Sequence, residues 1–382
     1  MNIREKHREL FGAEPVAAVR APGRVNLIGE HTDYNDGFVL PAALQFEVRM
    51  TASPRSDRQV RLYSITFQQS TTFSLDEIAP SVEASWSNYT RGVASILQKE
   101  GYPLSGMNAI IEGTVPIASG LSSSAALELA SLLVYEGVGQ FKIDPVSRAL
   151  LAQRAEREFV GVQCGIMDQF ISSLGRRDHA LLIDTRSLKY EPAPLPTGGI
   201  AIVVANTNVK RGLVDSEYNT RRKECEEAVA ALKEIYPAVK ALRDVDKAML
   251  EENKARLREV VYRRARHVIT ENDRTVQAVQ TLKAGDMAQF GRLMNESHAS
   301  LRDDYQVSCQ ELDILVELAQ NVSGVYGSRM TGAGFGGCTV SLVGSNAVGA
   351  FQSAVAPRYR EATGLETTIS VCQASDGAGP LP

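Results

Sequence analysis

The sequence predicts an α+β protein, and three observations support this prediction. Apolar and polar residues alternate over residues 46–73, as in antiparallel strands. Three stretches with helical spacing follow at 89–98, 122–135 and 144–159. A proline- and glycine-rich stretch at 190–199 then precedes a second half with mainly helical spacing, so we expect a domain boundary near residue 195.

The composition is that of a globular protein with a real core. The chain has 382 residues, of which 44% are hydrophobic and 23% charged, and a formal net charge of −4. This balance favours neither nucleic acid nor a membrane as a partner. The N-terminus lacks an apolar leader, and the five cysteines are odd in number and show no metal-ligand spacing. We therefore expect a cytoplasmic protein, either a monomer or a weak homo-oligomer.

The elements of the first half can be placed in order. Val25, Leu27 and Ile28 read as the end of a buried strand. The stretch 46–73 reads as an antiparallel hairpin that turns at Ser-Pro-Arg-Ser-Asp, 53–57. In the third helical stretch, Asp144 is expected as the N-cap and Pro145 as the first helical residue. Strands and helices thus alternate in this half.

The second half begins with a strand and continues as a helical layer. Residues 200–205 are apolar and strand-like, and 213–319 have helical spacing, broken at 236–237 and 285–286. Glycine-rich loops and short strands, including 338–343, close the chain. We predict domains at 1–195 and 196–382.

The segment 21–41 gathers polar function at the end of the first strand. Its glycines let the backbone close around a small ligand. Glu30, His31 and Asp33 can converge on a hydroxyl-rich molecule, while Arg24 supplies a fixed positive charge. The alternative is a surface turn, but a turn does not need so many charged residue types.

The segment 115–128 runs from a strand through Gly120 and three serines into a helix. Free backbone N–H groups and hydroxyls at a helix N-terminus form a phosphate cradle. No Gly-Lys-Ser or Gly-Lys-Thr follows, so this is not a Walker A loop. A serine-capped helix without a ligand is the alternative.

Two further segments are candidates for function: one contains an aspartate that needs a partner, and the other matches a dinucleotide-binding motif only formally. Asp168 follows Gly165 among apolar residues and needs a partner, for which Arg24 is the natural candidate; a helix N-cap is the alternative. Residues 332–337 fit Gly-x-Gly-x-x-Gly, but they lead into a strand rather than a helix, which argues against a dinucleotide site. The alternative for this loop is a hairpin turn.

These segments closely resemble the motifs of galactokinases, which belong to the superfamily of homoserine, mevalonate and phosphomevalonate kinases. The likeness spans nearly the whole chain, and 330–338 is similar to the third superfamily motif. It implies a two-domain small-molecule kinase fold with a left-handed βαβ unit in the N-terminal domain and the active site in the interdomain cleft. It also implies transfer of a phosphoryl group from ATP to the C1 hydroxyl of galactose, with Mg²⁺.

The resemblance also implies the site residues. The catalytic residues are Asp168, which either accepts the hydroxyl proton or chiefly orients the hydroxyl, and Arg24, which acts on the transferring phosphoryl group. The sugar is held by Glu30, His31, Asp33, Gly165, Asp168 and Tyr218. ATP is held by Gly120, Leu121, Ser122, Ser123, Ser124 and Ala125. The metal ligands are Ser124 and Glu156.

The sequence departs from the family pattern at one place, and two alternative functions remain open. Arg211-Gly212 stands where the family usually has a His and a small polar residue. The stretch 263–273 is similar to the family but receives no chemical role; alone it reads as a basic helix turn with a capping Thr. A sister kinase for N-acetylgalactosamine and a non-catalytic galactose and ATP sensor are the rival functions. The intact Glu-His-Thr-Asp-Tyr-Asn-Asp-Gly run and the complete 120–126 loop argue against them.

Overall fold

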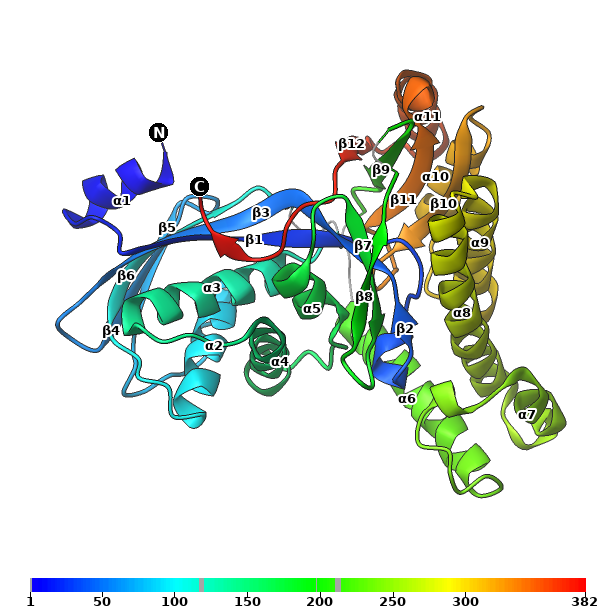
Figure 1. Cartoon of the computed structure of the whole chain (residues 1–382), viewed down its shortest axis with the longest axis horizontal. Helices are drawn as coiled ribbons and strands as arrows, with labels where there is room; N and C mark the ends of the chain where they lie inside the picture. Colours follow the sequence, from blue (N-terminus) through cyan, green and yellow to red (C-terminus); the bar gives the residue numbers. More distant parts are fainter. Residues whose placement is uncertain (1, 117–119, 197, 210–213) are drawn as a thin grey trace.

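The computed structural model describes residues 2–116, 120–196, 198–209 and 214–382, and it combines three sheets with helices packed against them (Figure 1). The strands are β1 Ala17–Asn26, β2 Phe38–Val39, β3 Pro41–Pro54, β4 Gln59–Ser64, β5 Gln69–Ser74, β6 Met107–Gly113, β7 His179–Asp184, β8 Tyr190–Pro194, β9 Ile200–Asn206, β10 Val325–Thr331, β11 Cys338–Gly344, β12 Thr368–Cys372 and β13 Gly379–Pro380. The helices are α1 Ile3–Phe11, α2 Asn88–Lys99, α3 Ser123–Gly139, α4 Pro145–Ala155, α5 Met167–Leu174, α6 Val214–Lys233, α7 Lys247–Glu252, α8 Glu259–Ala284, α9 Met287–Ser300, α10 Gln310–Gln320 and α11 Val348–Thr363. The mixed α and β class predicted from the sequence is confirmed.

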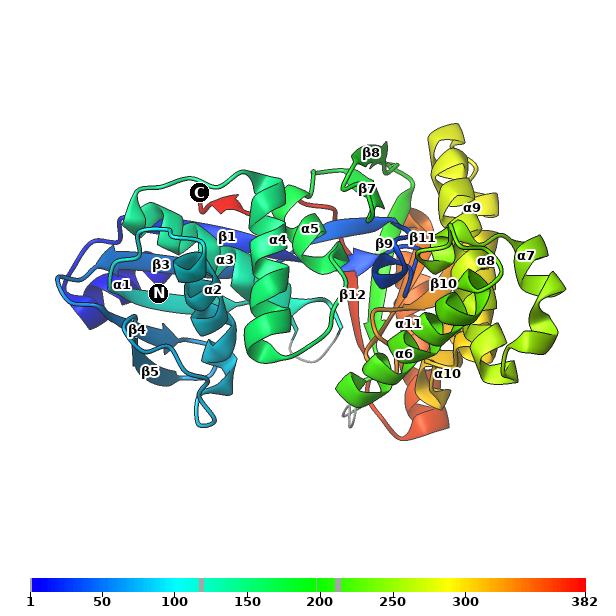
Figure 2. The same ribbon diagram turned by 90° about the horizontal axis from the view of Figure 1, so that it is seen from below.

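The first sheet has the strand order β13-β1-β3-β6-β4-β5. Helices α2, α3, α4 and α5 lie over the face seen from below (Figure 2), where α3 packs against β1 and β3. The predicted hairpin over 46–73 is wrong in its pairing. Strands β3 and β4 flank the 53–57 turn but do not pair with each other, because β6 lies between them, antiparallel to β3 and parallel to β4. The hairpin of this region is β4–β5.

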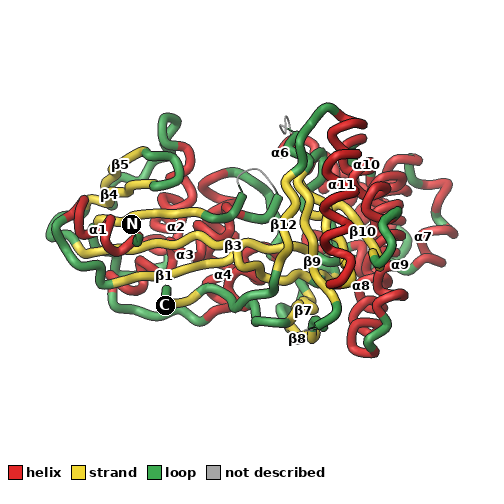
Figure 3. The backbone as a smooth tube through the Cα atoms, turned by 90° about the horizontal axis from the view of Figure 1, so that it is seen from above, coloured by secondary structure: helices red, strands yellow, loops and turns green. Residues whose placement is uncertain are grey.

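The second sheet has the order β10-β11-β9-β12, and its strands run in a different direction from those of the first sheet (Figure 3). The alternation of side chains along β9 explains its two helical layers. Ile202 and Val204 join the core that includes residues of α8 and α9, while Val203 and Ala205 join the core with α10 and α11. An apolar run such as 200–205 therefore serves a sheet covered on both faces.

The chain crosses between its halves more than once. The predicted boundary near residue 195 lies between β8, in the small sheet β2-β7-β8, and β9, in the second sheet. We keep this boundary as a proposal. The C-terminal segment then returns to the first sheet, where β13 pairs with β1.

Most of the predicted helix limits agree with the structure. Asp144 caps α4 by accepting hydrogen bonds from the backbone N–H groups of Val146 and Ser147, and Pro145 is the first helical residue. The helical stretch of the second half is broken after α6 and between α8 and α9, as expected. Thr270 caps no terminus, because α8 continues through it and its hydroxyl bonds to the Arg266 carbonyl. Within the described ranges, no helix has the length and apolarity needed to cross a membrane.

Candidate active site

A cavity of about 150 Å³ lies where the end of β1, the start of α5 and the loop after β10 meet. The residues that line it are Arg24, Glu30, His31, Asp33, Glu156, Val162, Cys164, Gly165, Met167, Asp168, Tyr218, Gly332 and Ala333. Every residue expected to hold the sugar or to catalyse its reaction is in this set. Charged and polar side chains from distant parts of the sequence thus converge on a space that suits a small polar molecule.

Arg24 and Asp168 form a two-point ion pair in this cavity. The Arg24 Nε donates to Asp168 Oδ1 at 2.8 Å and its Nη2 to Oδ2 at 2.6 Å. The same guanidinium donates to the carbonyl of Gly120, and the Arg24 N–H donates to that of Leu121. Arg24 therefore joins the carboxylate to the serine-rich loop, and the pairing expected from the sequence is confirmed.

Ser122 completes this group. It begins the turn into α3 with φ +62°, a left-handed conformation that is uncommon outside glycine, and its hydroxyl donates to Asp168 Oδ2 at 2.5 Å. Asp168 itself lies in the first turn of α5, where the helix dipole favours a negative charge. Asp168 is thus held from three directions, and its carboxylate has a fixed orientation.

Asp33 lies against the backbone of Gly165. A Cβ on Gly165 would lie 1.7 Å from Asp33 Oδ2, so only glycine leaves room for this carboxylate. Burial, together with the charges of Asp168 and Glu30, raises the pKa of Asp33 to about 6. Gly165 is therefore required because any side chain there would occupy the space of the Asp33 carboxylate.

His31 lies among aromatic rings and keeps a strained backbone, with φ +63°. Its Nδ1 is 2.8 Å from the Tyr34 hydroxyl, which is 2.6 Å from the Tyr305 hydroxyl. The ring of Tyr218 packs at 5.7 Å from the His31 ring. Burial and the nearby His267 lower the pKa of His31 to about 3, so the imidazole is neutral and can hydrogen-bond without carrying charge.

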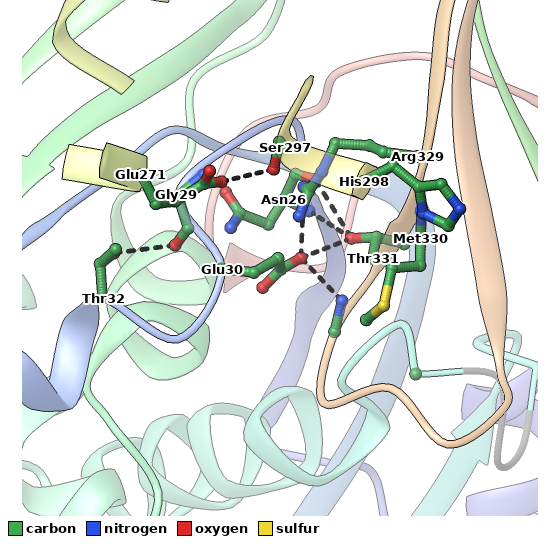
Figure 4. Close-up of polar contacts among 12 residues, drawn as sticks. Asn26, Gly29, Glu30, Thr32, Glu271, Ser297, His298, Arg329, Met330 and Thr331 are labelled. Atoms are coloured by element: carbon green, nitrogen blue, oxygen red, sulfur yellow. Dashed lines mark hydrogen bonds and ion pairs between the residues drawn. The ribbon is translucent and has the colours of Figure 1, made fainter. Parts of the chain in front are cut away.

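Glu30 is held by the loop after β10 (Figure 4). Its Oε1 accepts a hydrogen bond from the Gly332 N–H at 2.7 Å and lies 3.1 Å from the Thr331 hydroxyl. Gly332 also approaches the serine-rich loop, since a Cβ there would lie 3.2 Å from the Gly120 carbonyl. This close approach of the third motif to the other two agrees with the sequence analysis.

Gly334, two residues further on, has a different environment. A Cβ at Gly334 would lie 2.1 Å from the Val307 carbonyl, in the second half of the chain. Only glycine fits at position 334 because of this contact with Val307. Unlike Gly332 and Ala333, Gly334 does not line the cavity.

Glu156 and Ser124 form a second polar group at the edge of the cavity. Glu156 begins a π-helical turn, Glu156–Val160, and is buried. Burial and the charge of Asp168 raise its pKa to about 7, although hydrogen bonds from Cys164, Ser124 and Gln169 oppose this. Gln169 Nε2 also donates to Glu128, whose pKa is raised well above its usual range by burial and by Glu156. Hydroxyl and carboxylate oxygens in an acidic, buried setting are the donors that Mg²⁺ prefers.

A larger cavity of about 550 Å³ adjoins Ser123 and Ser124. Its walls include Trp86, Phe67 and Tyr89, and the rings of Phe67 and Trp86 stack at 6.2 Å. Trp86 is the single tryptophan of the chain, and Phe67 is half exposed. The sequence analysis assigned these residues no role.

The structure also shows residues that the sequence analysis missed. His267 Nε2 contacts the Glu30 carbonyl at 3.1 Å, and Glu271 accepts the Gly29 N–H at 2.9 Å. Both lie in 263–273, which received no chemical role. Arg211 and Gly212, the departure from the family pattern, lie outside the described residues.

Three family models match the chain. Residues 5–54 match the galactokinase galactose-binding signature. Residues 88–176 match the N-terminal domain of GHMP kinases, and residues 278–361 match the C-terminal domain of GHMP kinases. The first match contains Arg24, Glu30, His31 and Asp33, and the second contains the serine-rich loop, Glu156 and Asp168.

Relatives named galactokinase are similar to this chain along nearly their whole length. A galactokinase of Roseiflexus sp. is 52% identical over 377 residues, covering 99% of this chain and 96% of the relative. A galactokinase of Chloroflexus aggregans is 50% identical over 367 residues, covering 96% and 94%. The crystal structure of Lactococcus lactis galactokinase complexed with galactose is 39% identical, with a TM-score of 0.95 over 99% of this chain and 98% of that one. The crystal structure of Methanococcus jannaschii mevalonate kinase shares the fold, with a TM-score of 0.66 and 17% identity. The match covers 94% of this chain and 98% of that one.

Proposed function

The chain belongs to the galactokinase family of the GHMP kinases, and we propose that it transfers the γ-phosphoryl group of ATP to the C1 hydroxyl of α-D-galactose. The observation that carries this proposal is the Arg24–Asp168 pair, which links the polar cavity to the serine-rich loop. Galactose 1-phosphate and ADP are the products.

The polar cavity is the proposed sugar site. Glu30 and Asp33 accept hydrogen bonds from sugar hydroxyls, neutral His31 and Tyr218 supply further polar contacts, and Gly165 keeps the space that Asp33 needs. A site built to bond an axial 4-hydroxyl leaves a buried polar group unpaired when that hydroxyl is equatorial. Galactose is therefore preferred over glucose.

Asp168 is proposed to orient the C1 hydroxyl. The hydroxyl oxygen attacks the γ-phosphorus, the bond between that phosphorus and the β,γ-bridging oxygen breaks, and the hydroxyl proton passes to Asp168. An aspartate is a weak base for a sugar hydroxyl, so the proton passes to Asp168 late, after the phosphorus–oxygen bond has begun to form. Alignment and the positive charge of Arg24 then supply most of the rate enhancement.

ATP is proposed to enter from the larger cavity. The backbone N–H groups and hydroxyls of residues 120–125 at the start of α3 suit the phosphates, and the apolar walls with Trp86 and Phe67 suit the adenine ring. This arrangement brings the γ-phosphate toward Arg24, which is bonded to Gly120.

Mg²⁺ is proposed to be held by Ser124 and Glu156. The described residues contain no group of three His, Cys, Asp or Glu side chains suited to a metal, which agrees with a Mg²⁺ that takes its other ligands from water and phosphate. The ion, when bound, supplies positive charge to the phosphates. Gln169 holds the Glu156 carboxylate in place.

The setting of the enzyme is also a proposal. The five cysteines all lie among the described residues and none forms a disulfide, which supports the reducing environment of the cytoplasm. The proposed assembly is a monomer or a weak homo-oligomer.

A coupled assay of ADP release over a panel of hexoses tests the function. Galactose should be turned over with a catalytic efficiency at least about tenfold above that of glucose, since an unpaired buried polar group costs about 1–3 kcal/mol. Equal efficiencies would contradict the proposed sugar site. Preference for N-acetylgalactosamine would indicate the sister kinase, and sugar binding without ADP release would indicate a sensor.

A further inference from the structure

The sugar loop, residues 29–33, is held by residues of the second half of the chain (Figure 4). Glu271 of α8 accepts the Gly29 N–H, and His267 of the same helix contacts the Glu30 carbonyl. Arg329 and Thr331 of β10, together with Gly332 directly after it, supply the contacts to the Glu30 carboxylate. The loop that recognises the sugar is thus covalently part of the first half but is positioned by the second.

Arg329 on β10 is the positively charged residue that contacts the Glu30 carboxylate. It is fully buried, with an exposed fraction of 0%, and Glu30 is 2% exposed. Its Nη1 donates to the Asn26 carbonyl at 3.0 Å and lies 3.5 Å from Glu30 Oε1. Arg329 therefore spans from the end of β1 to the carboxylate four residues later.

The contacts to Glu30 are one-sided. Arg329, Thr331 and Gly332 all approach Oε1, and no described hydrogen bond goes to Oε2. Glu30 also lines the polar cavity. One carboxylate oxygen is thereby fixed, and the other is left to face a ligand.

The charge of Arg329 reaches the rest of the loop as well. Arg329 adds to the effects of burial and His267, which lower the pKa of His31. It also helps to lower the pKa of Glu271, where burial raises the pKa and Arg274 is the largest effect that lowers it. A buried ion pair is a weak source of stability, because desolvation offsets much of the attraction. Its value here lies in fixing where Glu30 points.

We propose that Arg329 is a positioning residue for sugar recognition: it fixes Glu30 Oε1 so that Oε2 accepts a hydrogen bond from one particular sugar hydroxyl. This inference rests on the proposed function, in which Glu30 is a sugar ligand. Arg329 does not touch the sugar; it acts through Glu30, with Thr331 and Gly332 as additional donors.

The test measures the KM of galactose and of each monodeoxygalactose for the wild type, Glu30→Gln and Arg329→Met. Glu30→Gln should identify one hydroxyl, because the sugar lacking it is insensitive to this substitution. Arg329→Met should raise the galactose KM by about tenfold or more, leave the KM of ATP within about twofold, and lose its effect on the same deoxy sugar. The double variant should be little worse than either single variant.

Arg148→Met is the matched control. Arg148 forms a two-point, partly buried pair with Glu136, between α4 and α3 and outside both cavities, so its loss tests general destabilisation. If Arg329→Met does not fold, Arg329→Lys and Thr331→Val replace it; each weakens one donor to Glu30 Oε1 and should affect the same hydroxyl.

The outcomes separate the two proposals. No turnover of galactose by the wild type overturns the proposed function, and a Glu30→Gln variant with unchanged KM for every sugar overturns the role of Glu30. The role of Arg329 is overturned if Glu30→Gln selects a hydroxyl but folded Arg329 variants do not. It is also overturned if they weaken all sugars equally, as Arg148→Met would.

Discussion

Two carboxylates that line the polar cavity, Asp33 and Glu156, lie in electrostatic surroundings opposite to those of Glu271, which accepts the Gly29 N–H of the sugar loop. In the cavity, burial and the charge of Asp168 raise the pKa of Asp33 to about 6 and that of Glu156 to about 7. Beneath the loop, burial also opposes ionisation of Glu271, but Arg274, His267 and Arg329 outweigh it and lower its pKa to about 2.

This difference has opposite consequences for stability. Asp33 and Glu156 have folded-state pKa values above their unfolded values, so they favour folding at low pH, and this contribution is lost as the pH rises through 6 to 7. Glu271 has a depressed pKa, so it stabilises the fold above its unfolded pKa, and this contribution is lost as the pH falls toward 2. The crowded carboxylates of the active site thus lower the stability of the folded state at neutral pH. The contacts of His267, Glu271 and Arg329 to the sugar loop, which we call the anchor, offset part of this loss.

The largest expected effect concerns Asp168, which separates chemistry from binding. Asp168→Asn keeps the size of the side chain but removes its charge, its ability to take up the proton and one of its two acceptor oxygens, so turnover should fall by about a thousandfold or more, about 4 kcal/mol. Galactose affinity, measured by calorimetry, should change far less. Asp178→Asn, at an exposed position, is the control, and cooperative melting of both variants must be shown first. Turnover within about tenfold of wild type would transfer the catalytic role to Arg24.

Sequence reasoning found the cavity residues because they lie in three short motifs. Arg24 and Asp168 are 144 positions apart, yet each stood out as a charge beside apolar residues that required a partner. The hairpin prediction failed for a physical reason: the alternation over 46–73 is the same whether β3 pairs with β4 or with β6, and only long-range packing decides.

The anchor could not be predicted in the same way. His267 and Glu271 lie on a helix whose spacing is that of any amphipathic helix, and Arg329 lies in a strand that precedes the glycine-rich motif. Their role depends on the packing of α8 and β10 against the end of β1, and nothing local in the sequence encodes that. A buried Glu in a basic stretch was the available signal.

Glu271→Gln tests the anchor and should have the next largest effect. The variant keeps an acceptor for the Gly29 N–H but leaves Arg274 without its charge partner at 2.7 Å, so unfolding by urea at pH 7 should show a loss of about 3 kcal/mol. The difference from wild type should shrink below about pH 4, where Glu271 of the unfolded state is protonated. An equal loss at pH 3 and pH 7 would show that the charge of Glu271 is not what stabilises the loop.

Ser124→Ala should have a smaller effect, confined to the nucleotide side. The Mg²⁺ concentration needed for half-maximal turnover should rise by about tenfold, about 1.4 kcal/mol, because one proposed oxygen ligand is lost. Ser123→Ala is the neighbouring control. The KM of galactose should remain within about twofold in both variants. Unchanged Mg²⁺ dependence of Ser124→Ala would remove this residue from the metal site.

Asp33→Asn should have the smallest effect and the opposite sign. The amide cannot ionise, so the cost of burying a charge and the repulsion from Asp168 and Glu30 both disappear, and without ligand the variant should be more stable than wild type at pH 8 by about 1 kcal/mol. At pH 3, below the unfolded-state pKa of about 4, Asp33 is protonated in both the folded and the unfolded protein, and the two proteins should unfold at nearly the same urea concentration. Galactose binding should weaken, since a charged acceptor is lost. Unfolding curves at both pH values, with Asp178→Asn beside them, measure this directly. A variant less stable than wild type at pH 8 would mean that Asp33 supports the fold through its hydrogen bonds with Tyr34 and Met167, and that the cavity stores less repulsion than its crowded carboxylates indicate.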